Sequence, residues 1–138
     1  MDKLPPKILI VDDDEDSRQM LNFLLETWSY RVVEAKDGIE AVSLAERERP
    51  DLILMDVKLP RLDGFDVTRR IRQSEQTNGV PIVFLSGCAE PHYRSAAAEV
   101  GGNEFLVKPL DFDKLQSTLG KYIGCSRRAS ANNSSSAA

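Results

Sequence analysis

The feature that most constrains the fold is an alternation of short apolar runs with amphipathic segments. Four runs are nearly continuous in apolar residues, and one more is weaker. The strong runs are Lys7–Val11, Asp51–Asp56, Pro81–Ser86 and Glu104–Lys108, and the weaker one is Tyr30–Glu34. Continuous apolar runs of this length are typical of strands that are buried on both faces, as in a parallel sheet.

Each run is followed by a segment in which apolar residues recur at helical spacing. These segments are Asp16–Trp28, Gly38–Arg47, Phe65–Gln73, Glu90–Val100 and Asp111–Ile123. Their apolar stripes include Met20 and Ile39, which we expect to face the core. Strands that alternate with helices form a parallel sheet with right-handed crossovers and helices on both faces. The sequence therefore predicts an α/β fold, a (βα)5 doubly wound parallel sheet of five strands.

Length and composition predict one globular domain. The chain has 138 residues, of which 41% are apolar and 29% charged, so it can bury a core. We expect a domain at residues 1–125, with its core at about 7–123, and a flexible tail rich in Ser, Ala and Asn at 126–138. No apolar run approaches the roughly 18 residues that cross a bilayer, and no signal region opens the chain. A cytoplasmic location, without membrane contact, is expected by default.

Charge and the scarcity of certain residues argue against several classes of protein. The net charge of −4 argues against direct binding of nucleic acid through a broad basic face. The single histidine, His92, excludes a site with two His ligands and weakens a Ser-His-Asp interpretation. The two cysteines, Cys88 and Cys125, have no metal-ligand spacing, so we expect reduced thiols.

Acidic residues follow two of the runs, at the strand ends where parallel sheets bind ligands. Asp12 and Asp13 follow the first run, and Asp56 ends the third. If the strand order is 2-1-3-4-5, these strands are neighbours and the three carboxylates converge. Like charges about 4 Å apart repel by about 4 kcal/mol at an effective dielectric constant of 20, so a proton or a cation must settle the site. Mg²⁺ suits such oxygen ligands and needs only one or two carboxylates.

The fourth and fifth runs end in groups that complement an anion. Ser86 offers a hydroxyl donor and Lys108 an ammonium group. Together with a metal ion, these groups could each neutralise one oxygen of a phosphoryl group. Asp56 is the candidate nucleophile, because the Pro and Gly of the loop that follows it would hold its side chain above the sheet. The paired acids suit metal binding better.

These motifs together resemble the receiver domain of two-component response regulators. The matching residues are Ile8-Leu9-Ile10-Val11-Asp12-Asp13, Asp56 with Leu59-Pro60 and Asp63-Gly64, Ser86-Gly87, and Phe105-Leu106-Val107-Lys108-Pro109. The match spans about residues 7–123, and it is the combination in this order that is specific. The resemblance implies the flavodoxin-like strand order 2-1-3-4-5 and a cis peptide bond before Pro109.

The resemblance also implies a role for each residue of the site. Asp56 resembles the phosphoacceptor, Ser86 the switch hydroxyl and Lys108 the phosphate-binding lysine. The implied Mg²⁺ ligands are Asp12, Asp13, Asp56 and the backbone carbonyl of Lys58, with Asp13 favoured over Asp12 as the direct ligand. Phe105 stands where the family has an aromatic switch, but without a hydroxyl it would work by packing alone. Lys58 and Cys88 occupy positions that tune dephosphorylation in the family.

The implied function is a signalling switch and not a metabolic enzyme. The phosphoryl donor would be a sensor histidine kinase or a His-phosphotransfer protein. The downstream target would be a protein that binds the face formed by residues 90–100, 104–108 and 111–123. The chain would act as a monomer or as a phosphorylation-dependent dimer. It would work alone or as the receiver fragment of a longer regulator.

Three other functions compete with this hypothesis. A phosphatase of the haloacid-dehalogenase type would carry a second Asp two residues after its nucleophile, where this chain has Lys58. A flavin- or nucleotide-binding domain would need Gly, Ser or Thr amides after the first strand, where the acids would repel a phosphate. A phosphorylation-independent interaction module would not need the complete set of acids, hydroxyl and lysine.

Overall fold

The strands form one parallel sheet in the order β2-β1-β3-β4-β5, as the sequence predicted. The structure is a computed structural model, and it describes residues 4–124. The strands are β1 (Lys7–Val11), β2 (Arg31–Ala35), β3 (Leu52–Asp56), β4 (Ile82–Ser86) and β5 (Glu104–Val107). Every residue of β3 and β4 is buried, which explains their unbroken apolar sequences.

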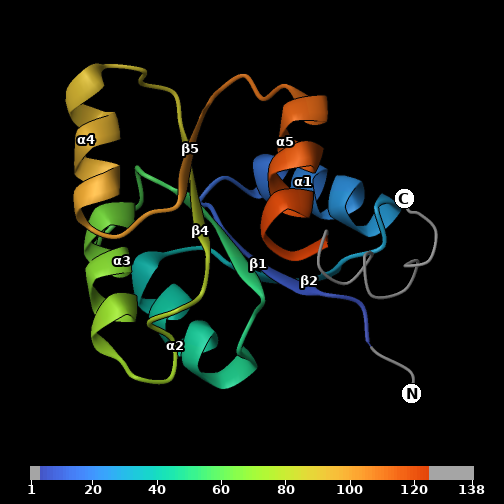
Figure 1. Ribbon diagram of the computed structural model, residues 1–138, viewed down its shortest axis with the longest axis horizontal. Coiled ribbons are helices and arrows are strands. Elements are labelled where there is room, and N and C mark those ends of the chain that lie inside the picture. Colours follow the sequence, from blue (N-terminus) through green and yellow to red (C-terminus); the bar gives the residue numbers. More distant parts are fainter. Residues whose placement is uncertain (1–3, 125–138) are drawn as a thin grey trace.

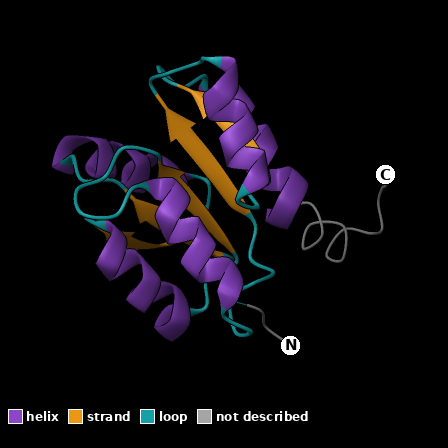
Figure 2. Cartoon of the chain, turned by 90° about the vertical axis from the view of Figure 1, so that its left-hand side faces the viewer, coloured by secondary structure: helices purple, strands orange, loops and turns teal. Residues whose placement is uncertain are grey.

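Helices cover both faces of this sheet (Figure 1; Figure 2). They are α1 (Glu15–Thr27), α2 (Gly38–Glu48), α3 (Gly64–Gln73), α4 (Pro91–Glu99) and α5 (Phe112–Leu119), which continues as the π-helix η1 (Gly120–Gly124). Buried side chains of α2, α3 and α4 form one core cluster with one face of the sheet. Those of α1 and α5 form a second cluster on the opposite face. The fold is therefore the predicted doubly wound sheet.

An aspartate caps the start of four of the helices. Its side chain accepts a hydrogen bond from the backbone N–H three residues further on, which satisfies one of the free donors of the first turn. The pairs are Asp14 with Ser17, Asp37 with Glu40, Asp63 with Asp66, and Asp111 with Lys114. The exception is α4, which follows Glu90 without a side-chain cap.

Some details differ from the sequence predictions. Strand β2 begins at Arg31, and Tyr30 is a buried residue that precedes it. Met20 and Ile39 are wrong as core residues, because they are 43% and 50% exposed. Other residues of these helices are buried instead, such as Leu21 and Leu25 of α1 and Ala41 and Ala45 of α2. A helix on the surface of a sheet buries only one face, and Met20 and Ile39 lie outside it.

The predicted tail at 126–138 lies outside the described residues. Within residues 4–124, no helix has both the length and the apolar character that a membrane crossing requires.

Candidate functional site

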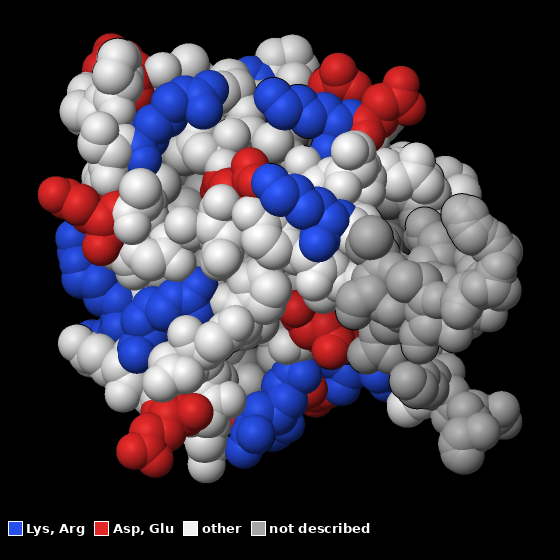
Figure 3. Space-filling view, in the orientation of Figure 1, with Lys and Arg blue, Asp and Glu red and all other residues white. Residues whose placement is uncertain are grey.

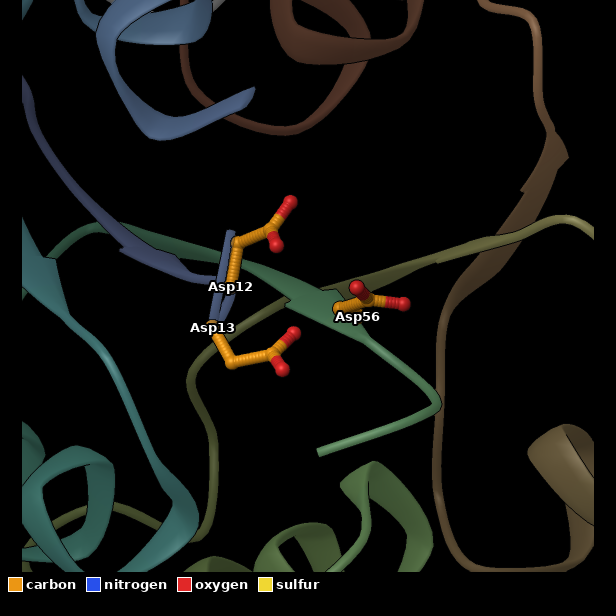
Figure 4. A group of neighbouring side chains, drawn as sticks. All are labelled: Asp12, Asp13 and Asp56. Carbon is orange, nitrogen blue, oxygen red and sulfur yellow. The ribbon is translucent and has the colours of Figure 1, made fainter. Parts of the chain in front are cut away.

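Three carboxylates meet at the carboxyl edge of the sheet, as predicted. β1 and β3 are neighbours in parallel register, with Val11 opposite Met55, so the residues that follow them lie side by side. One carboxylate oxygen from each of Asp12, Asp13 and Asp56 lies within 4.8 Å of the others. Figure 4 shows Asp12 and Asp13 extending from the end of β1 toward the side on which Asp56 lies.

Asp12 is the most enclosed of the three acids. Asp12 is only 2% exposed, and its Oδ1 accepts a hydrogen bond of 2.9 Å from the backbone N–H of Asp14. Among the described residues, its Oδ2 has no hydrogen-bond partner, and the nearest cation is Lys108 Nζ at 3.8 Å. A buried carboxylate oxygen without a donor is costly. The donor set, three carboxylates that include a buried oxygen without a hydrogen-bond partner, therefore fits a hard divalent cation such as Mg²⁺.

Asp56 is buried and its charge is opposed by its surroundings. Burial raises the pKa of this carboxyl from 3.8 to about 6, against the neighbouring Lys108, which lowers it, while the carboxylate of Asp12 raises it further. The backbone N–H of Lys58 points to Asp56 Oδ1 at 3.4 Å. The carboxyl is thus mostly ionised at pH 7 but binds a proton at a higher pH than an exposed aspartate.

Lys108 supplies the positive charge of the site. It follows β5, and the peptide bond to Pro109 is cis, as expected. Its Nζ lies 3.4 Å from Asp56 Oδ2. Because its ammonium group lies between the carboxylates of Asp56 and Asp12, it is placed to contact an anion bound on Asp56.

The Ser86 hydroxyl is engaged within its own loop. Ser86 ends β4 and is 2% exposed. Its Oγ accepts a hydrogen bond from the N–H of Cys88 at 3.0 Å and donates to the carbonyl of Cys88 at 3.2 Å. The structure therefore places Ser86 beside the acids, as predicted, but its hydroxyl must leave Cys88 before it could bind a phosphoryl oxygen.

A pocket of about 600 Å³ joins these groups. Its lining comes from the ends of β1, β3, β4 and β5, and consists of Asp13, Asp56, Lys58, Leu59, Pro60, Ser86, Gly87, Cys88 and Lys108. The lining combines the acids Asp13 and Asp56 with Lys58 and Lys108, so groups that suit a cation and groups that suit an anion face the same space. No broad basic face is visible in the space-filling view, where positive and negative side chains are interspersed (Figure 3).

Two supporting contacts of the site were not predicted. The Nη1 of Arg18 donates to the backbone carbonyl of Asp12 at 2.8 Å, and its Nε donates to Glu34 at 3.1 Å. Gly64 packs so closely that a Cβ at this position would overlap the backbone oxygen of Asp56. A glycine after the capping Asp63 was a recognisable signal for a loop, but nothing in the sequence links Arg18 to Asp12.

Phe105 lies on the same face of the sheet as Ser86. In the β4–β5 register, Phe84 is opposite Phe105 and Ser86 is opposite Val107. Side chains two residues apart on a strand share a face. The Phe105 ring is partly buried against the core cluster, and the guanidinium of Arg94 covers it at 5.0 Å from the ring centre.

A family model for the response regulator receiver domain matches residues 8–120. The chain belongs to this family. Receiver domains act in two-component systems, and phosphorylation and Mg²⁺ binding are general features of the family. The fold, the strand order and the acidic cluster described above are those of a receiver domain.

Solved receiver domains superpose on nearly the whole described chain. The receiver domain of the sensor histidine kinase PA1611 from Pseudomonas aeruginosa, which has a magnesium ion coordinated in its active-site cleft, is 40% identical with a TM-score of 0.81. That match covers 87% of this chain and 98% of the other. The chemotaxis protein CheY4 of Vibrio cholerae is 34% identical with a TM-score of 0.82, and the match covers 86% and 99% of the two chains.

A curated relative shows the receiver as part of a longer protein. The probable transcriptional regulator ycf27 of Porphyridium aerugineum is 33% identical over 127 residues. These residues are 92% of this chain and 52% of the relative. The chain thus spans about half the length of that regulator.

Proposed function

We propose that Asp56 accepts a phosphoryl group, with Mg²⁺, from the phosphohistidine of a sensor histidine kinase or a His-phosphotransfer protein. The observation that carries this proposal is the cluster of three carboxylates within 4.8 Å, with Lys108 Nζ 3.4 Å from Asp56. An anionic carboxylate is a useful nucleophile here only if its charge and that of the phosphoryl group are both compensated. The chain brings the compensating groups together at one edge of the sheet.

In the proposed reaction, a carboxylate oxygen of Asp56 forms a bond to phosphorus. The bond between phosphorus and the histidine nitrogen breaks, and its electron pair stays on the imidazole. Asp12, Asp13, Asp56 and the carbonyl of Lys58 would hold Mg²⁺, which would neutralise negative charge on the phosphoryl oxygens. The product is an aspartyl phosphate on Asp56.

Lys108 and Ser86 act on the remaining phosphoryl oxygens. Lys108 needs little movement, because its Nζ already lies between Asp56 and Asp12. The hydroxyl of Ser86 turns from Cys88 toward the phosphoryl group, to which it donates a hydrogen bond. The space that the Ser86 hydroxyl leaves lies on the same face of the sheet as Phe105. The Phe105 ring then moves inward, and α4, β5 and α5 repack.

The proposed output is a change in protein contacts. The repacked face of α4, β5 and α5 would bind a downstream protein, or a second copy of the chain in a phosphorylation-dependent dimer. The chain would work in the cytoplasm, without direct contact with nucleic acid or membrane, either as a stand-alone receiver or as the receiver of a longer regulator. It would catalyse only its own phosphorylation and dephosphorylation, so it is not a metabolic enzyme.

The test is intact-mass analysis after incubation with acetyl phosphate, with and without Mg²⁺. We expect one added phosphoryl group that depends on Mg²⁺, is stable in acid and is lost in base. Asp56→Asn should abolish the addition. The matched control is Asp113→Asn, an exposed acid on α5, which should be labelled like the wild type.

Two results would contradict the proposal. Labelling that persists in Asp56→Asn would move the phosphoacceptor to another residue. If the folded wild type stays unlabelled while a known receiver is labelled under the same conditions, the chain would be a phosphorylation-independent interaction module.

A further inference from the structure

Helix α4 packs on the rest of the domain through few buried side chains. Of its residues, only Ala97 is buried, and its N-terminus lacks a side-chain cap. The helix therefore depends on side-chain contacts near its start to fix its position.

Two consecutive residues provide such contacts in different directions. The ring of Tyr93 meets that of Phe65 on α3 edge to face, with ring centres 6.1 Å apart. Phe65 in turn contacts Phe84 of β4 at 5.3 Å. Arg94 reaches instead to β5, where its guanidinium carbon lies 5.0 Å from the centre of the Phe105 ring. Tyr93 thus packs α4 against α3, and Arg94 contacts β5.

We propose that Arg94 is a positioning residue that holds Phe105 in its place in the unphosphorylated protein and thereby opposes the switch. This proposal rests on the proposed function, because it concerns the ring that moves when Asp56 is phosphorylated. We expect inward movement of Phe105 to separate the ring from the guanidinium, and the contact then stabilises one state only. A contact present in one of two states shifts the equilibrium toward that state.

The guanidinium of Arg94 has no competing acidic partner nearby. Among residues 4–124, no carboxylate lies within 4.0 Å of it, and the adjacent acid Glu90 faces His92 at 3.3 Å. A guanidinium over an aromatic ring is attracted by the negative face of the ring. Arg94 is exposed, and at an exposed site this attraction corresponds to a change of about two- to fivefold in an equilibrium constant.

The experiment measures the affinity for beryllofluoride, a mimic of the phosphoryl group, in the presence of Mg²⁺. We expect Arg94→Ala to bind this anion about two- to fivefold more tightly than the wild type, because the opposing contact is lost. Removal of a positive charge would by itself weaken the binding of an anion, so the expected effect has the opposite sign to the general electrostatic one. Arg70→Ala, at an exposed arginine of α3, is the matched control and should show no gain.

Two further measurements separate this role from a structural one. In a Phe105→Leu background, Arg94→Ala should give no gain in beryllofluoride affinity, since there is no ring to hold. In the metal-free protein without beryllofluoride, the NMR signals of the Phe105 ring should shift in Arg94→Ala, while the free energy of unfolding stays close to that of the wild type.

The outcomes distinguish the two proposals. If the wild type binds beryllofluoride but Arg94→Ala binds it equally or more weakly, the role of Arg94 is wrong and the proposed function stands. An equal gain in the Phe105→Leu background would also overturn it. If the wild type binds no beryllofluoride with Mg²⁺, the proposed function itself fails, and the role of Arg94 fails with it.

Discussion

At the scale of single residues, Asp56 shows how the site is held in an energetically unfavourable state. Its carboxyl is buried near a second carboxylate, and both effects oppose its charge. Lys108 offsets part of this but leaves the pKa at about 6. A buried carboxylate in this condition is stabilised when a proton or a cation binds to it, so its surroundings favour cation binding.

This condition predicts a specific dependence of stability on pH. Between pH values of about 4 and 6, the folded protein holds a proton on Asp56 that the unfolded chain has lost, because the folded pKa is about 6 and the reference value is 3.8. The free energy of unfolding therefore falls as the pH rises through this window, by up to about 3 kcal/mol. Asp56→Asn lacks this loss, so its stability relative to the wild type should increase from pH 4 to pH 7.

Urea denaturation in the presence of EDTA at a series of pH values measures this difference. Asp113→Asn, at an exposed position, serves as the control and should show no such change. A stability difference between Asp56→Asn and the wild type that is constant from pH 4 to pH 7 would contradict the raised pKa.

At the scale of elements, the connection from β3 to α3 positions Asp56. The N–H of Gly64 donates to the carbonyl of Val57 at 2.8 Å, which closes the loop that follows Asp56. A Cβ at Gly64 would overlap the backbone oxygen of Asp56 and lie 3.1 Å from the Cα of Val57. The start of α3 and the end of β3 are therefore in contact through backbone atoms, which have little freedom to move apart.

Gly64→Ala tests this contact. We expect the free energy of unfolding to fall by about 1–3 kcal/mol, as in an overpacked site, and labelling at Asp56 to fall as the loop is displaced. Gly79→Ala is the matched control, because no atom beyond this glycine and its two chain neighbours lies within 4 Å of the position of its Cβ. Its stability should match the wild type within about 0.5 kcal/mol. Equal effects of the two substitutions would show that close packing at Gly64 is unimportant.

The strands and helices could be predicted where the sequence pattern that marks them lies within the element itself or directly beside it. Buried strands leave continuous apolar runs, and capping aspartates such as Asp37 and Asp111 stand next to the helices that they begin. The convergence of Asp12 and Asp56 needed the strand order, which came from the resemblance to receiver domains. The hydrogen bonds of Ser86 with Cys88 were not predictable, because a serine rotamer depends on the loop around it.

At the scale of the whole molecule, Arg72 connects segments that no sequence pattern links. From α3, its guanidinium donates to the carbonyl of Gly101 at 2.8 and 3.1 Å, to that of Asn78 at 3.0 Å and to Asn103 Oδ1 at 3.1 Å. It joins the C-terminal end of α3 to the loop before β4 and to the turn before β5. Burial lowers its pKa, but the guanidinium keeps its charge at neutral pH.

Arg72→Ala should therefore destabilise the entire domain. We expect the free energy of unfolding to fall by about 2 kcal/mol, because several charge-assisted hydrogen bonds are lost and carbonyl groups are left without donors. Urea denaturation measures the change, with Arg70→Ala as a control on the same helix. A loss of less than about 0.5 kcal/mol would show that solvent replaces these hydrogen bonds.

The two ends of the described chain lie opposite the acidic edge. β1 starts at the amino edge of the sheet, and η1 ends there too, since the hydroxyl of Tyr122 donates to the carbonyl of Asn103 just before β5. A further protein segment attached at either end would emerge on the side away from Asp56. Another domain tethered at either end can thus lie away from the acidic pocket and leave its entrance open to the phosphoryl donor that we propose.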